Sequence, residues 1–196
     1  MANLILWVGL WIWHVLHYTS RPLFNYVDLK SKNNHPKTNL KWILNTVIIG
    51  PCVMFPVIYK LDTFYRGIAW SVLEILVLYA IYSVLFFAIH VLFHSRWMYK
   101  WHKYHHSYIQ ITHPWSAFDA TWIEHACINV FPLAFGCLIM NASQSVCILF
   151  VIVGTENSMM AHTGKSMFHS LHHLYRNVNY GVDPICDKLF KTIRYE

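Results

Sequence analysis

The chain has 196 residues, of which 56% are hydrophobic, 17% aromatic and 12% charged. The charged fraction is about half that of an ordinary soluble domain, which argues against a water-soluble globular protein. The 15 lysines and arginines outnumber the 9 acidic residues. No basic arm or nucleic-acid motif accompanies this excess, so nucleic acid is not expected as a partner. The length predicts a single domain, residues 1–196.

A series of apolar segments separated by polar stretches dominates the chain. A helix needs about 20 apolar residues to cross a membrane, so the first segment is short for a span and the third is the longest. Pro51 and Pro56 predict a bend in the second, and residues 141–145 join the last two into a predicted hairpin. We therefore expect an all-α integral membrane bundle of about four to five helices. The segments are residues 4–18, 42–59, 68–93, 126–140 and 146–160.

The distribution of basic residues predicts the orientation of this bundle. If every segment crosses the membrane, residues 18–41, 94–124 and 161–196 share one side and contain thirteen of the fifteen lysines and arginines. Only Lys60 and Arg66 lie on the other side. Lysine and arginine accumulate in cytoplasmic loops, so the more basic side is expected to face the cytoplasm.

Histidines cluster on this predicted cytoplasmic side. One His-x-x-x-His pair and two His-x-x-His-His triplets have the i, i+3, i+4 spacing that places side chains on one face of a helix. Imidazole is a good ligand for iron, zinc, copper and nickel. One ion takes about four to six ligands, so eight or nine imidazoles predict a site for two metal ions that caps the bundle. The candidate ligands are His90, His94, His102, His105, His106, His162, His169, His172 and His173.

The clusters resemble the three histidine boxes of the fatty acid hydroxylase/sterol desaturase superfamily. The resemblance extends over about residues 86–196. Ala161-His162-Thr-Gly164 is similar to the A-H-S-G segment that precedes the last box in C-4 methylsterol oxidases. Asn179-Tyr180-Gly181, followed by Asp187-Lys-Leu-Phe-Lys-Thr192, is similar to the closing N-Y-G and W-D-R-L-F-G-T motifs. Cys186 and Lys191 stand where tryptophan and glycine are usual in that ending.

One segment departs from the pattern of the sterol-oxidising members. They carry A-H-P-x-E where this chain reads Ala120-Thr-Trp-Ile-Glu124, so Thr121 replaces a histidine. The neighbouring His125 is a candidate substitute ligand. Glu124 and Asp187 are candidates to hydrogen-bond the ligand histidines from behind. Glu74, about 24 Å before the first box along a helix, is expected to be a neutral, hydrogen-bonded side chain near the far side of the membrane.

The resemblance implies a non-haem di-iron centre, with two iron ions, that uses O₂ to hydroxylate or desaturate a lipid in lipid biosynthesis. The substrate would be sterol-type or fatty acyl/sphingoid, and no catalytic residue is expected beyond the metal ligands. Neither G-x-G-x-x-G nor the H-P-G-G haem motif is present, so cytochrome b5 or an NAD(P)H-dependent reductase is expected to supply electrons. In a eukaryote, the expected membrane is the endoplasmic reticulum.

Two other functions are compatible with the histidine clusters. Imidazole ligands do not exclude zinc, so a non-catalytic zinc- or iron-binding membrane protein is an alternative. Metal transport is the other, although a transporter would place its ligands at mid-membrane depth, whereas these clusters flank the spans. The H-E-x-x-H motif of zinc proteases and the G-x-S-x-G motif of serine hydrolases are absent.

Overall fold

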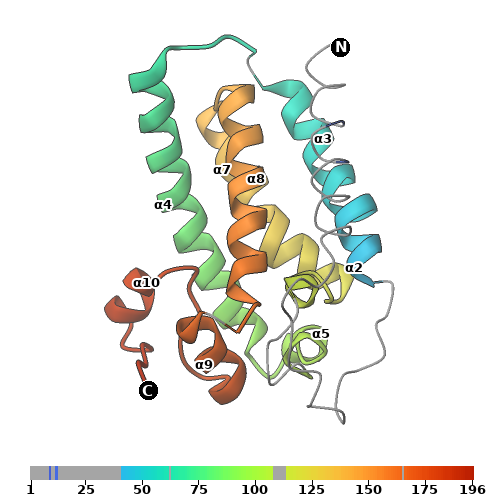
Figure 1. Cartoon of the computed structure of the whole chain (residues 1–196), viewed down its shortest axis with the longest axis vertical. Helices are drawn as coiled ribbons and strands as arrows, with labels where there is room; N and C mark the ends of the chain where they lie inside the picture. The colour runs from blue at the N-terminus through green and yellow to red at the C-terminus, as the bar shows by residue number, and fades with distance from the viewer. Residues whose placement is uncertain (1–8, 10–11, 13–40, 62, 108–113, 165) are drawn as a thin grey trace.

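Four long apolar helices form the body of the protein in the computed structural model (Figure 1). The structure describes residues 9, 12, 41–61, 63–107, 114–164 and 166–196. Within these residues, four helices are long and apolar enough to cross a membrane, and no strand is present. The prediction of an all-α integral membrane bundle is thus confirmed. The predicted segment 4–18 lies outside the described residues, apart from Gly9 and Ile12.

Each span is a continuous helix, and two of the four change helix type along their length. The first combines α2, η1 and α3 over Lys41–Lys60, and the third combines α6, η4 and α7 over Trp122–Met140. The bounds along the spans are α2 Lys41–Ile43, η1 Leu44–Ile49, α3 Gly50–Lys60, α4 Ile68–Phe93, α6 Trp122–Glu124, η4 His125–Val130, α7 Phe131–Met140 and α8 Gln144–Ala161.

A proline follows each of the two π-helical segments closely. Pro51 lies in the first turn of α3, just after η1, and Pro132 lies in the first turn of α7, just after η4. Proline has no N–H to donate, and its ring clashes with the carbonyl four residues earlier. A widened π turn before the proline relieves that clash while the helix continues. The bend expected from Pro51 and Pro56 therefore takes the form of a change of helix type.

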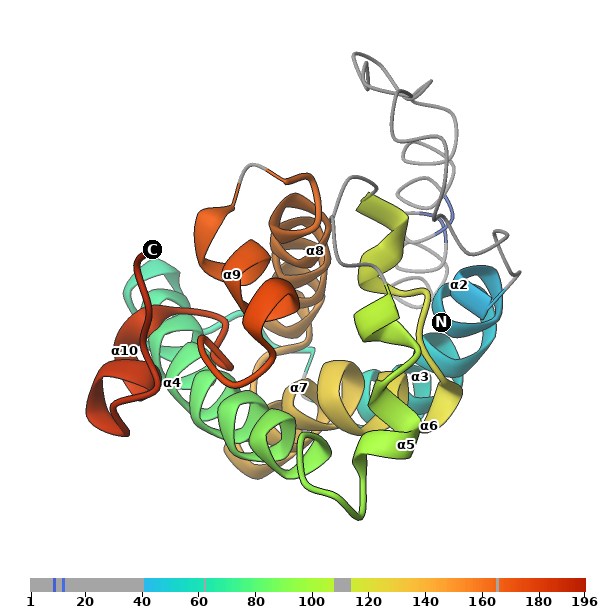
Figure 2. The ribbon, with the colours of Figure 1, turned by 90° about the horizontal axis from the view of Figure 1, so that it is seen from below.

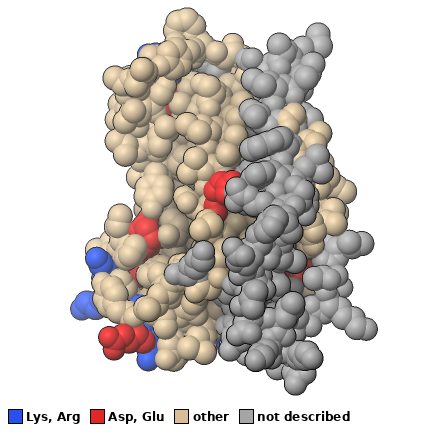
Figure 3. Space-filling model, in the orientation of Figure 1, with Lys and Arg blue, Asp and Glu red and all other residues tan. Residues whose placement is uncertain are grey.

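The outer surface of the spans is apolar. Ile68, Leu76 and Val84 of α4 are 77%, 62% and 57% exposed. In water, such a surface would strongly favour aggregation, but it suits contact with lipid chains. In Figure 3 the visible face of the spans is almost free of charge, and lysines and arginines gather mainly at the end that carries α9 and α10.

The inner faces of the four spans pack together at the end opposite the histidines. A buried cluster including Ile58, Leu78, Cys137 and Cys147 joins α3, α4, α7 and α8. Asn141 adopts the left-handed conformation, with φ of 45°, and closes the tight turn between α7 and α8. The predicted hairpin is therefore confirmed.

Short helices gather at the other end of the bundle, where α4 and α8 finish and the first and third spans begin (Figures 1 and 2). This arrangement places segments from the middle and the end of the chain beside one another. The short helices are α5 Tyr99–His102, η2 His105–Ser107, η3 Pro114–Ala117, α9 Met167–Tyr175 and α10 Pro184–Leu189.

Candidate metal centre

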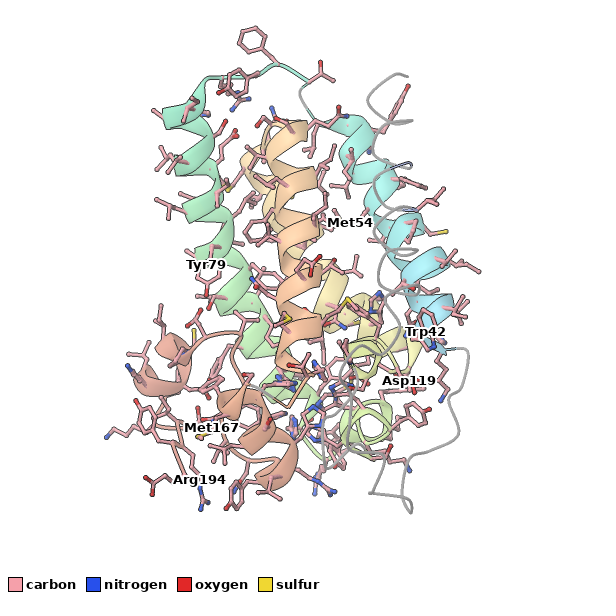
Figure 4. All side chains as sticks on the ribbon, viewed as in Figure 1. Trp42, Met54, Tyr79, Asp119, Met167 and Arg194 are labelled. Carbon is pink, nitrogen blue, oxygen red and sulfur yellow. The ribbon has the colours of Figure 1, made fainter. Side chains whose placement is uncertain are left out.

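Five imidazoles meet where α4 ends. His90 and His94 lie one turn apart at the end of this helix, so their rings project from the same face. His102 ends α5, His106 lies in η2, and His172 comes from α9. One ring nitrogen of each lies within 4.8 Å of the corresponding nitrogens of the others. We call these residues the five-histidine group; ring nitrogens gather at this end of the bundle in Figure 4.

The Nε2 atoms of the five-histidine group converge. His106 Nε2 lies 3.0 Å from His102 Nε2 and 3.1 Å from the Nε2 atoms of His94 and His172. His90 Nε2 lies 3.0 Å from His102 Nε2. A pair of neutral imidazoles can share one N–H···N hydrogen bond, but a set of five around one point cannot all be paired in this way. Hydrogen bonds between the rings therefore cannot account for most of these Nε2–Nε2 contacts.

Backbone carbonyls fix the tautomers of two of these rings. His90 Nδ1 donates to the Tyr180 carbonyl at 2.6 Å, and His172 Nδ1 donates to the Val178 carbonyl at 2.7 Å. A carbonyl can only accept, so the proton of each neutral ring is on Nδ1. The Nε2 atoms of His90 and His172 consequently carry lone pairs that point into the group.

Glu124 holds a third ring in the same way. Its Oε1 atom lies 2.8 Å from His102 Nδ1, and both side chains are buried. A carboxylate that accepts from Nδ1 leaves the lone pair on Nε2 and increases the basicity of the ring. Glu124 therefore has the position expected for a residue that supports a ligand from behind.

Four other imidazoles form a second group. His162 follows α8 directly, His169 and His173 lie one turn apart on α9, and His105 lies in η2. Their ligand nitrogens also lie within 4.8 Å of one another. His162 Nε2 is 3.2 Å from His105 Nε2 and 3.0 Å from His169 Nε2, while its Nδ1 donates to the Ser158 carbonyl at 2.8 Å. We call these residues the four-histidine group.

The doubled histidines divide between the groups. His105 and His106 are adjacent in the sequence, but one belongs to the four-histidine group and the other to the five-histidine group. His172 and His173 divide in the same way. The two groups therefore lie side by side, and the ring centroids of His106 and His173 are 4.8 Å apart.

Burial favours the uncharged form of most of these imidazoles. It lowers the pKa of His94 to about 3 and that of His162 to about 4. It also lowers the pKa values of His105, His106 and His169 well below the ordinary value of histidine, with neighbouring rings adding to the effect. Neutral rings keep the lone pairs that metal ions require.

Both groups fit a metal ion. Histidine nitrogens lie about 2.1 Å from a bound ion, so adjacent ligands of an octahedral ion are about 3.0 Å apart. The Nε2 separations of 3.0 to 3.2 Å match this value. A cation at the centre of each group would also replace lone-pair repulsion with attraction. Five ligands exceed the four of a tetrahedral zinc site and suit an ion with a higher coordination number.

A comparison with protein families agrees with this geometry. The model of the fatty acid hydroxylase family matches residues 75–192, which include both histidine groups. The chain belongs to the fatty acid hydroxylase family. The match begins inside α4, somewhat before the range of about 86–196 over which the sequence motifs extend.

Curated relatives carry the same family name. The human fatty acid hydroxylase domain-containing protein 2 is 28% identical over 201 residues, covering 91% of this chain and 60% of its own length. The Macaca fascicularis protein of that name gives the same identity and coverage. Fatty acid hydroxylase ahd1 of Mycosarcoma maydis is 31% identical over 115 residues, or 55% of this chain and 30% of its own. This chain thus spans about three fifths of the first two relatives, and no solved structure matches it.

The family's closing motif supplies hydrogen-bond acceptors that the sequence does not reveal. Asp187 accepts hydrogen bonds from Tyr180 N, Gly181 N and Thr192 Oγ1 at 2.9, 2.7 and 2.6 Å. These bonds hold the turn whose Tyr180 carbonyl accepts from His90. Asp187 thus supports a ring through a peptide group and, among the described residues, has no hydrogen bond with a histidine. The N-Y-G motif was the available signal, but it does not indicate that backbone carbonyls are the functional atoms.

The structure places His125 apart from both groups. Its ring lies edge-on to Phe118, and its Nδ1 is 3.3 Å from Asn129 Nδ2. His125 follows Glu124 directly, and a step of one residue turns a helix by about 100°, so the two side chains face different neighbours. His125 is therefore not included in the proposed ligand set. Thr121, at the position of the family histidine, instead caps α6 by accepting from Glu124 N.

Glu74 lies at the opposite end of the bundle, as predicted, but it has a charged partner. Its Oε1 atom is 3.3 Å from Arg66 Nη1 and accepts from Ser143 N, and its Oε2 atom accepts from Ser143 Oγ at 2.6 Å. The expectation of a neutral glutamate is therefore corrected to an ion pair. The pair satisfies a buried charge and ties the start of α8 to α4.

Proposed function

We propose that this protein is an O₂-dependent lipid hydroxylase or desaturase that holds one iron ion in each histidine group. The observation that carries the proposal is the convergence of nine imidazoles into adjacent groups of five and four at one end of a membrane bundle. The family match supports lipid oxidation as the reaction class. Bound iron would supply oxidation of an unactivated C–H bond, which acid–base side chains alone cannot perform.

The chain's own residues would hold and orient the ions. The five-histidine group would bind one ion through Nε2, with Glu124 and the Tyr180 and Val178 carbonyls fixing three of the rings at Nδ1. The four-histidine group would bind the other, with the Ser158 carbonyl fixing His162. Such hydrogen bonds typically raise metal affinity about 10- to 100-fold.

The position of the groups suits a lipid substrate. They lie where spans end, so a lipid can reach them laterally from the bilayer without crossing water. The buried rings also exclude bulk water from the reacting region. We further propose that this end faces the cytoplasm, in the endoplasmic reticulum of a eukaryotic cell, and receives electrons from cytochrome b5 or an NAD(P)H-dependent reductase. The excess of basic residues at this end supports the orientation.

Metal content and lipid products test the proposal together. The full chain should be purified from iron-replete cells, and its iron and zinc should be measured by mass spectrometry. We expect two iron ions per chain, one for each group. Lipids of the expressing cells should gain hydroxylated or desaturated species that disappear under iron chelation. Zinc as the sole bound metal, together with an unchanged lipid profile, would instead identify a non-catalytic metal-binding protein.

A further inference from the structure

Residues 179–194 form a closed loop that carries α10. Hydrogen bonds tie the two ends of this loop together. Asn179 N donates to the Thr192 carbonyl at 3.0 Å, and Asn179 Nδ2 donates to the Arg194 carbonyl at 2.9 Å. Arg194 N donates in return to Asn179 Oδ1 at 2.7 Å. A loop of this size whose ends are held together is a compact unit. We call residues 179–194 the α10 loop.

The α10 loop packs against the side of α4. Asp183 Oδ2 accepts hydrogen bonds from Tyr79 Oη at 2.8 Å and from Ser83 Oγ at 2.7 Å. The Phe190 ring stacks on the Phe87 ring, with centroids 5.2 Å apart. Figures 1 and 2 both show α10 on the outer side of α4, away from the other spans. The loop is therefore docked on the outside of the membrane bundle.

The contacts with α4 lie at the depth of the hydrocarbon core of a membrane. The core takes about 20 residues of a helix, and α4 has 26. At most about six residues can therefore project from the core at either end of α4, so every placement of the core includes residues 74–87. Tyr79, Ser83 and Phe87 all lie in that range. The part of the α10 loop that contacts them consequently lies beside hydrocarbon.

The side of the α10 loop that faces away from α4 is apolar. Ile185 and Leu189 lie one turn apart on α10 and are 66% and 73% exposed. Val182 before this helix and Phe190 after it are exposed as well. On α4, the exposed residue Val84 follows the docking position directly. The apolar side of the loop therefore continues the lipid-facing surface of the span.

Hydrogen bonds satisfy polar groups of the loop that hydrocarbon could not. Asp187 accepts hydrogen bonds from two backbone N–H groups and from the Thr192 hydroxyl. Asp183 Oδ1 accepts from Ile185 N at 2.7 Å, while its Oδ2 accepts from the two hydroxyls of α4. Polar groups without partners are costly in hydrocarbon, and acidic side chains are tolerated there when they are paired. Both carboxylates of the loop meet this requirement.

We propose that the α10 loop is embedded in the membrane leaflet on the histidine side, with its apolar side in contact with lipid acyl chains. Lys188 and Lys191 are exposed near the apolar positions. Their side chains can lie along acyl chains and extend their ammonium groups to lipid phosphates. The partner of this surface is therefore phospholipid of the bilayer. Insertion of the loop goes beyond the proposed function and is independent of whether the protein oxidises a lipid.

The inserted loop is joined to the candidate metal centre through one residue. The Tyr180 carbonyl accepts from His90 Nδ1 at 2.6 Å. Tyr180 also belongs to a buried cluster with Phe87 of α4 and Cys186 of α10. The loop thus anchors the support of one ring of the five-histidine group at the membrane.

Fluorescence quenching in nanodiscs tests the depth of the loop. The five native cysteines are replaced, and Ile185→Cys and Leu189→Cys are each labelled with bimane in the full chain with its bound metal. The quenchers are a phospholipid with a nitroxide on its acyl chain and aqueous iodide. We expect both labels to be quenched by the nitroxide, and by iodide at least about threefold less than a label at Lys103→Cys, because hydrocarbon excludes ions.

A reference label calibrates quenching by the nitroxide. Leu76 of α4 is 62% exposed and lies within residues 74–87, so Leu76→Cys reports the response of a side chain in hydrocarbon. We expect the two loop labels to resemble this reference and to differ from the label at Lys103→Cys, an exposed position at the histidine end.

Variants test the cause of insertion, with the label kept at Leu189→Cys. Ile185→Glu places a charge among acyl chains, so quenching by iodide should rise about threefold and quenching by the nitroxide should fall. Ile185→Val, which keeps the side apolar, is the matched control and should change neither. Tyr79→Phe combined with Ser83→Ala removes both donors to Asp183 from α4 and should shift the label in the same direction as Ile185→Glu. Size-exclusion chromatography selects folded protein for each measurement.

Two results would overturn the embedded loop. One is quenching of both loop labels by iodide as strong as at Lys103→Cys, with none by the nitroxide, which would leave the apolar side for a protein partner. The other is an unchanged depth in both Ile185→Glu and the α4 double variant. Quenching by the nitroxide in a protein that oxidises no lipid would support the embedded loop and count against the proposed function alone.

Discussion

The hydrogen bond at the Nδ1 atom of a histidine decides whether its Nε2 atom carries a lone pair. His90 and His172 donate to backbone carbonyls, and His102 donates to Glu124. Each ring is therefore held in one tautomer and one orientation, with its lone pair directed at its neighbours. At the scale of single residues, the candidate centre depends on these partners as well as on the imidazoles.

Removal of one ring tests the division into two groups. His105→Ala leaves three histidines in the four-histidine group and all five in the other. We expect iron to fall from about two ions per chain to about one, and lipid oxidation to fall at least 100-fold, because ligands matter more than the residues behind them. Lys103→Ala, at an exposed position between two ligands, is the matched control. Full iron content in His105→Ala would contradict the assignment.

Replacement of Glu124 tests the support of His102. Glu124→Leu removes the acceptor for His102 Nδ1, and we expect iron affinity to fall about 10- to 100-fold. Glu124→Gln keeps an acceptor oxygen but loses the charge, so its effect should be at most about tenfold. Competition with a chelator of known affinity measures both. Equal affinities for wild type and Glu124→Leu would exclude this role.

At the scale of elements, helix ends and turns bring the histidines together. α4 delivers two rings at its end, α9 delivers three, and the 179–181 turn supplies a carbonyl behind them. Gly181 is required in that turn, because a Cβ atom there would lie 2.5 Å from the Asp183 carbonyl. The 179–181 turn has little conformational freedom. We therefore expect that loss of its hydrogen bonds would also disturb the candidate metal centre.

Asp187→Asn tests this turn. The carboxylate accepts three hydrogen bonds, and an asparagine amide nitrogen cannot replace the oxygen it substitutes. We expect a loss of about 3 kcal/mol in the free energy of unfolding, together with weaker iron binding in the five-histidine group. Thermal unfolding in detergent and metal analysis measure these effects. Lys188→Ala, on the same helix, is the control, and unchanged stability of Asp187→Asn would refute the role of the turn.

At the scale of the whole molecule, the bundle separates two chemically different ends. Lys60 and Arg66 lie at the α3–α4 connection, whereas the histidines and most of the described lysines and arginines lie at the opposite end. Positively charged loops are retained in the cytoplasm during insertion. The proposed orientation therefore follows from the same helices that place the histidines.

Cysteine labelling in sealed microsomes tests this orientation. The background should have its five native cysteines replaced. A membrane-impermeant maleimide should label Lys103→Cys from outside the vesicles, which is the cytoplasmic side. Tyr65→Cys, at a position 56% exposed in the α3–α4 connection, should react only after permeabilisation. The reverse pattern would place the histidines on the lumenal side.

The sequence alone determined the spans and the candidate ligands. A long apolar run in lipid must satisfy its own backbone hydrogen bonds, so hydropathy predicted all four described spans. Helical spacing is a local property, so it also selected eight of the nine histidines that the structure brings together, while the resemblance of Ala161-His162-Thr-Gly164 to a family motif indicated the ninth.

The tertiary structure alone decided how those residues combine. Ring contacts such as His94 with His172 join positions 78 residues apart, and no local spacing predicts them. The carbonyl of Tyr180 behind His90 is also long-range, 90 residues away in the sequence. Local spacing likewise does not predict the division of His105 from His106 between the two groups. Helix phase, set by packing, turned Glu124 toward the histidines and His125 toward Phe118 and Asn129. Adjacent residues in the sequence thus acquired different roles because a helix presents them to different neighbours.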